Sequence, residues 1–257
     1  ATMATKKATP AKTSTDVAVR KTTSIANIKD ALRAQAEANA ARIEPGSGKS
    51  IRIGQDKSFT LPDGTKTREA LQLVVVDFVS RNEYYESAFR KDSFVPPNCF
   101  AISPDPKTLV PSDNAPDKQN DSCRGCPMNE FGSAPTGSGK ACKNTRMLAV
   151  LPPDADSDTE LWTLKVSPTG IKGFDGFVAS VNRAFQLPPI GVVVTVGFSD
   201  GVDYPSLTFD DPQPNDNVAV HYGRQEEARE LLMREPDVSN FEATKAKPAQ
   251  RKRAGTR

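Results

Sequence analysis

Cysteine is the residue type with the clearest chemical pattern in this chain. Cys123 and Cys126 form a CxxC pair, and Cys99 and Cys142 are the only other cysteines among the 257 residues. Two thiolates separated by two residues can bind one tetrahedral metal ion from a tight turn, and Gly125 lets the backbone curl beneath it. Two further thiolates complete a closed structural site. The sequence therefore predicts one Zn²⁺ ion bound by Cys99, Cys123, Cys126 and Cys142.

Three other interpretations of the cysteines stay open. The same four thiolates suit an iron–sulfur cluster, or they are ordinary reduced cysteines. The third interpretation is a redox site. A redox CxxC pair normally begins a helix that follows a strand, whereas here Pro127 follows the pair, which disfavours this interpretation. The single histidine, His221, is an alternative fourth ligand to Cys99; otherwise its neighbours Val220 and Tyr222 suggest a half-buried strand residue.

Aromatic and basic residues alternate in three segments, near residues 81–91, 131–146 and 162–172. Rings that stack on bases, beside cations that neutralise phosphates, are what a groove for single-stranded nucleic acid needs. The same rings also suit a hydrophobic core. The candidate nucleic-acid-binding residues are Arg81, Tyr84, Tyr85, Phe89, Arg90, Lys91, Phe131, Lys140, Lys143, Arg146, Trp162, Lys165 and Lys172.

No catalytic signature accompanies these residues. The glycine-rich stretches 45–50 and 136–140 lack the first glycine of a phosphate-binding loop and are better interpreted as linkers. The acidic residues are scattered, and no nucleophile motif or zinc-protease motif occurs. The sequence therefore favours a protein that is not an enzyme.

The formal charge is unevenly distributed. Residues 1–33 contain seven Lys and Arg against two Asp, and residues 242–257 contain six against one Glu. Because the whole chain carries +2 and each end +5, the rest carries −8. Basic ends of this kind are solvated tails or contact a polyanion. An acidic body opposes phosphate binding and favours a protein partner.

Hydrophobic periodicity predicts a mixed, mainly β fold, a small barrel or curled sheet with one packed helix and a loop insertion held by zinc. The family resemblance described below implies that this barrel is OB-like. The strongest elements are a buried strand at 71–79, strands at 146–151, 160–166 and 190–198, and a helix between them. The predicted organisation is a disordered basic arm at 1–23, an amphipathic helix at 24–45, an OB-like core at 46–212 with the metal-bound insertion at 95–145, a C-terminal helix at 213–235, and a disordered basic tail at 236–257.

The sequence contains no apolar run long enough to span a membrane, and its start does not have the pattern of a secretory signal peptide. We therefore expect no association with a membrane.

The residues from Cys123 to Leu151 resemble a family of tailed-bacteriophage proteins associated with phage DNA metabolism. The similar strings are CRGCPMNEFGS, GKACKNTRMLAVL, PPNC ending at Cys99, and LWTLKVSPT beginning at Leu161. A more distant analogy is the single-stranded DNA-binding protein of T-even phages, an OB fold with a zinc site of three cysteines and one histidine. That protein ends in an acidic tail, whereas this chain ends in a basic one.

This resemblance implies a single-stranded DNA-binding protein of phage replication or recombination, with a structural zinc, in the cytoplasm of the infected bacterial host. Single-stranded DNA and phage replication proteins are the implied partners. The alternative is a phage structural or regulatory protein in which the helix at 24–45 and the tails bind a polymerase or a virion component.

Overall fold

A computed structural model describes residues 31–32, 34–35, 49–86, 95–239 and 241. The chain divides into two units, at residues 1–47 and 48–257. Residues 31–32 and 34–35, within the predicted helix 24–45, are helical. The predicted arm at 1–23 and the tail beyond residue 241 lie outside the described residues. Among the helices of the described part, none has the length and apolar character needed to cross a bilayer.

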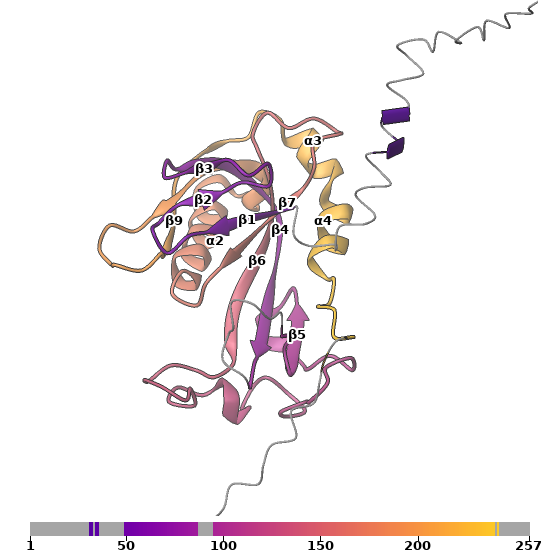
Figure 1. Ribbon diagram of the computed structural model, residues 1–257. Helices are drawn as coiled ribbons and strands as arrows, with labels where there is room; N and C mark the ends of the chain where they lie inside the picture. The colour runs from indigo at the N-terminus through magenta and orange to yellow at the C-terminus, as the bar shows by residue number, and fades with distance from the viewer. Residues whose placement is uncertain (1–30, 33, 36–48, 87–94, 240, 242–257) are drawn as a thin grey trace, which may run out of the picture. The chain divides into compact units, whose positions relative to one another are not determined.

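Five antiparallel strands form the centre of the second unit, in the spatial order β7-β6-β4-β8-β9. Helix α2 connects β7 to β8, and this strand order with one connecting helix is that of a curled sheet or partly open small barrel. This confirms the mixed, mainly β prediction with one packed helix (Figure 1). The elements are β4 at Leu71–Tyr84, β6 at Lys143–Leu151, β7 at Trp162–Val166, α2 at Ile171–Phe185, β8 at Val192–Phe198 and β9 at Leu207–Pro214.

Four shorter strands extend this sheet. β1 (Ser50–Ile53) runs parallel to β7, and β2 (Phe59–Thr60) and β3 (Lys66–Thr67) follow it in antiparallel pairs. β5 (Cys99–Ser103) pairs with the last residues of β4. The predicted insertion at 95–145 is therefore not loop throughout, because its first part is a sheet strand and its last residues belong to β6. Residues 95–98 and 104–142 of the insertion lack strands.

β4 is longer than the predicted strand 71–79 because its second half is also paired. Residues 80–84 lie between β5 and β6, and a bulge between Val75 and Asp77 separates the two halves. The aromatic and basic segment near residues 81–91 thus begins as strand. Figure 1 shows β4 running from the barrel strands to β5 and the insertion, so one strand supports both regions.

The inner face of the sheet forms the larger apolar cluster. Valines of β8 and leucines of β6 and β7 pack there against Phe174 and Phe177 of α2. Phe174 lies edge-on to Phe78 and Phe209, with ring centroids 5.0 and 5.1 Å apart. A 15-residue helix with apolar residues three and four apart buries one face in this way. The barrel interior is therefore filled by side chains.

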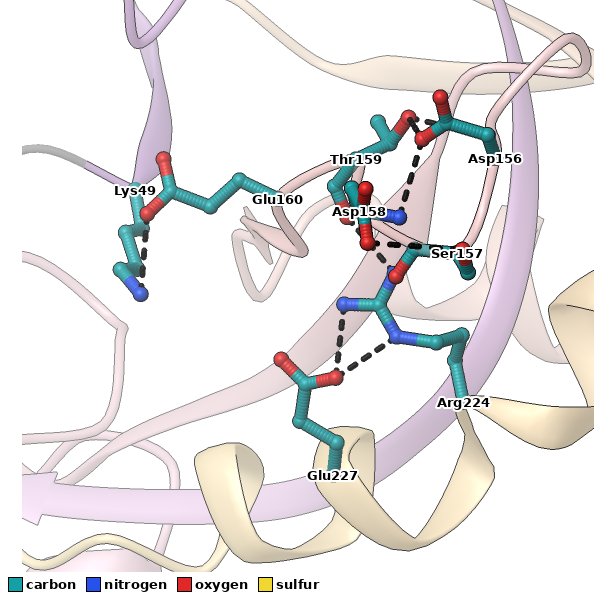
Figure 2. A network of polar contacts seen from close by, with 8 residues as sticks. All are labelled: Lys49, Asp156, Ser157, Asp158, Thr159, Glu160, Arg224 and Glu227. Atoms are coloured by element: carbon teal, nitrogen blue, oxygen red, sulfur yellow. Dashed lines mark hydrogen bonds and ion pairs between the residues drawn. The ribbon is translucent and has the colours of Figure 1, made fainter. Parts of the chain in front are cut away.

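The outer face of β4 and β6 is covered by a second, smaller cluster. Val76, Val79 and Leu151 pack there against Ala228 and Leu232 of α4, which spans Gln225–Leu232. Arg224, at the start of α4, donates to the backbone carbonyls of Ser157 (3.1 Å) and Thr159 (2.7 Å) and pairs with Glu227 (Figure 2). This contact fastens the helix to the connection between β6 and β7.

The predicted single helix at 213–235 is instead the end of β9 followed by α3 (Val218–Gly223) and α4. His221 lies in α3, fully buried, and is not a half-buried strand residue. Its Nε2 lies 3.2 Å from the Pro152 carbonyl, which can only accept, so Nε2 carries the proton. Nδ1 then accepts from the Asn215 amide nitrogen at 3.0 Å.

Protein stability should fall as the pH is lowered through the ordinary titration range of histidine. Burial lowers the pKa of His221 below its usual value of 6.5, so the folded protein binds this proton less readily than the unfolded chain. The stabilisation from neutral His221 is therefore present above pH 6.5 and is lost as the pH falls toward the lower folded-state pKa. Urea unfolding at several pH values between 7.5 and 5 measures the slope, and His221→Gln should flatten it. An equal slope in the variant would contradict this assignment.

Candidate functional site

The four cysteines line one small cavity at the far end of β4. The cavity measures about 20 Å³, room for one water-sized sphere, and Asn82 and Tyr84 of β4 also line it. Cys99, Cys123 and Cys126 are buried and Cys142 is half-buried. The described fold thus brings together the complete set of predicted metal ligands.

Local hydrogen bonds set the position of each cysteine. Cys99 opens β5 opposite Tyr84, and the Cys123 backbone N–H donates to the Leu109 carbonyl. The Cys142 N–H donates to the Met128 carbonyl at 2.8 Å, which closes the loop that begins after Cys126. Gly125 adopts a φ of +77°, a conformation that favours glycine and turns the chain between the two thiols of the CxxC pair.

The thiols interact electrostatically with one another. Burial raises the pKa of Cys99, Cys123 and Cys142, and charge on the neighbouring cysteines raises each of them further. For Cys142 the pKa rises to about 12. In the opposite direction, the Asn82 side chain acts as a hydrogen-bond donor that lowers the pKa of Cys123. The site is therefore one in which several thiolates cannot coexist without a compensating positive charge.

Within the described ranges, no group of three or more His, Cys, Asp or Glu side chains has an arrangement that could hold a metal ion. His221 does not line this cavity. It belongs to α3, where its ring contacts Asn215 and the Pro152 carbonyl. The alternative in which His221 replaces Cys99 as a ligand is therefore wrong for this fold.

Three predicted nucleic-acid-binding residues share the outer face of the sheet, beside the region that α4 covers. Lys143 of β6 is exposed, and Lys165 of β7 has 47% of its side chain exposed. Arg81 of β4 is only 14% exposed and donates to the Arg234 carbonyl at 2.6 Å. Glu83 lies between them, 7% exposed, and its carboxylate is 2.7 Å from Lys165 Nζ. The accessible cations of this face are therefore Lys143 and Lys165.

Two more predicted residues meet in loop 127–141 of the insertion. The Phe131 ring is 82% exposed, and Lys140 Nζ lies 5.0 Å from its centroid, a cation–π contact. Ser133 holds the loop together by donating to the Met128 and Glu130 carbonyls and accepting from the Ala141 N–H. This exposed ring is thus carried by an ordered loop. Tyr85, 39% exposed at the end of β4, is a further accessible ring.

The other predicted residues do not join this surface. Arg146 is on the inner face and pairs with Asp175 of α2, where Lys172 also lies. Trp162 packs at the edge of the inner apolar cluster, as its alternative interpretation suggested, and Tyr84 lines the cysteine cavity. The remaining candidates, Phe89, Arg90 and Lys91, lie outside the described residues. The predicted set therefore does not form a single groove.

The acidic character of the body is concentrated elsewhere. Residues 184–223, which include β8 and β9, contain five Asp and no Lys or Arg. β6 and β7 contain Lys143, Arg146 and Lys165 and no acidic residue. A wider cleft of about 670 Å³ lies beside β8 and β9, lined by residues of both charges such as Arg68, Asp200 and Asp210. The negative field that argued against phosphate binding is thus centred away from Lys143 and Lys165.

Two functional side chains were missed by the sequence analysis, Asn82 and Glu83. Asn82 faces the cysteine cavity and Glu83 faces the cationic surface, because successive residues of a strand point to opposite sides of the sheet. Residues 81–83 are all polar, so no hydrophobic alternation in the sequence marks them as part of a strand.

Comparison of the chain with protein-family models, with curated proteins and with solved structures finds no match. The geometry described above is therefore the basis for a functional proposal.

Proposed function

We propose that this protein is a non-enzymatic single-stranded DNA-binding protein. The observation that carries the proposal is the connectivity of the partly open barrel, which we interpret as OB-like, with the cysteine-containing insertion as the connection between the first and second barrel strands, β4 and β6. OB folds bind oligonucleotides on the face of the second and third strands and on the loops beside it. In this chain those elements are β6, β7 and the insertion.

The side chains on these elements support the proposal. Lys143 and Lys165 supply positive charge for phosphates on the outer face of β6 and β7, while Phe131 and Tyr85 offer accessible rings at the same end of β4. Stacking on such rings is possible only when bases are unpaired, so it favours single strands over duplex. The resemblance of the cysteine segment to tailed-phage proteins is the support for proposing a role in phage replication or recombination, inside the infected host cell.

The full-length protein should bind a fluorescein-labelled single strand more tightly than the duplex of the same sequence. Each stacked base adds about 1–3 kcal/mol to the single-strand complex. Fluorescence anisotropy at several salt concentrations measures both affinities, with heparin as a control for general attraction to polyanions. Equal affinity for the two DNA forms, or binding to heparin alone, would overturn the proposal.

A protein partner is the second candidate function, and the cation-free stretch at 184–223 favours it. Asp200, Asp203 and Asp210 are exposed there beside Tyr204, which is 50% exposed. Exposed acidic groups and an exposed aromatic ring on this stretch suit a basic protein partner. In that case the protein would show no DNA binding even in low salt, and it would bind a phage replication or virion protein.

A further inference from the structure

We propose that Cys99, Cys123, Cys126 and Cys142 bind one zinc ion, which closes the base of loop 127–141. The four side chains come from β5, from the CxxC turn and from the residue before β6, and all of them line the same cavity. The other lining residues include neither carboxylate nor histidine. An all-thiolate donor set of four favours zinc in a closed tetrahedral structural site.

Loop 127–141 needs such a closure because it has no apolar core of its own. The only buried cluster of the surrounding insertion consists of Ala101, Leu109 and Cys123. Between Pro127 and Ala141 not one residue is buried, although the whole of this loop is described. Ordering an exposed loop costs about 1–2 kcal/mol per residue in backbone entropy. A bound metal ion is the usual substitute for hydrophobic burial in so small a unit.

The geometry also shows what binding would change. Zinc would draw four sulfurs that now line the cavity wall into one coordination shell, and so would fix Cys126 and Cys142 at the two ends of loop 127–141. Asn82 lies against Cys123 on one side of β4, and the adjacent Glu83 contacts Lys165 on the other. The site is thus attached to the strand that borders the proposed DNA surface.

The first experiment measures the metal itself, in full-length protein purified without added metal. Elemental analysis should find about one zinc per chain, and an organomercurial thiol reagent should release it to a chromophoric chelator in proportion to the thiols modified. Replacement of zinc by Co²⁺ should give the intense thiolate-to-cobalt absorption of a four-sulfur site. Protein that is folded but contains no metal, or that is brown and contains iron, would overturn the proposal.

Variants separate metal binding from general stability. Cys126→Ser should lower the zinc content and accelerate proteolysis within residues 104–142, while the barrel remains resistant. Val194→Ala is the matched control, because it creates a cavity in the inner cluster far from the cysteines and should leave the zinc content unchanged. If Cys126→Ser does not fold, the release experiment on the unmodified protein still decides. Equal zinc in Cys126→Ser and the unmodified protein would overturn the assignment.

One consequence rests on the proposed DNA-binding function. In zinc-loaded protein, Phe131→Ala should weaken single-strand binding by about 5- to 150-fold, the equivalent of one stacked base. After the zinc is removed, the same substitution should have little effect, because the loop no longer presents the ring. Zinc without DNA binding would refute the proposed function alone, whereas DNA binding without zinc would refute the metal site alone.

Discussion

Replacement of Phe174 by alanine should lower the free energy of unfolding by about 3–5 kcal/mol. The side chain is fully buried at the centre of the inner cluster and contacts the rings of Phe78, Phe177 and Phe209. Truncation removes this apolar surface from the core and leaves a cavity that the rigid strands around it cannot fill. Urea unfolding followed by circular dichroism measures the change.

Phe131→Ala is the matched control for this experiment. It makes the same chemical change at a ring that is 82% exposed, so its effect on stability should stay within about 0.5 kcal/mol. A comparable loss in Phe131→Ala would mean that this exposed ring also contributes to stability, and the comparison would then not isolate the core. If Phe174→Ala caused no loss, α2 would not be packed on the inner face of the sheet as described.

The double substitution of Lys143 and Lys165 by alanine should reduce the salt dependence of single-strand binding. Each phosphate contact that is lost removes counterion release, so the slope of log affinity against log salt should shrink by about 0.7 per lysine. Affinity at low salt should fall as well, with little change in sequence preference, because phosphate contacts carry no base information. Anisotropy titrations of one labelled oligonucleotide across a salt series test this expectation.

Lys172→Ala provides the corresponding control. Lys172 was predicted to belong to the same groove, but it lies on α2, which packs against the inner face of the sheet. Its substitution should leave the slope unchanged. A slope reduced by Lys172→Ala and unaffected by the double variant would move the proposed binding surface to α2.

The barrel was largely predictable because its core obeys simple periodicity. The β-branched runs near Leu73–Val76 and Val192–Val196 and the helical spacing of Phe174, Phe177 and Val181 each identify one element. The second half of β4 was not recognised, since Asn82 and Tyr84 of its inner face do not enter the barrel core and line the cysteine cavity instead. A strand whose buried side is polar has no hydrophobic alternation to detect.

The clustering of the cysteines was predictable from their restriction to one core-poor segment, but the grouping of the cations was not. Lys143 and Arg146 differ by an odd number of positions, so a paired strand sends them to opposite faces. His221 was assigned to a strand because its neighbours are Val220 and Tyr222. The hydrogen bonds of Asn215 and Asn217 to distant carbonyls position a helix there instead. Such long-range partners leave no local trace in the sequence.

Charge is separated along the sheet, because β6 and β7 carry only cations and β9 carries only anions. These strands therefore form a local electric dipole. A dipolar molecule that approaches a polyanion is turned by the field before any contact forms, so a larger share of encounters begins in a productive orientation. The benefit appears in the association rate rather than in the lifetime of the complex. It declines as added salt shortens the distance over which the field acts, to about 8 Å at physiological ionic strength.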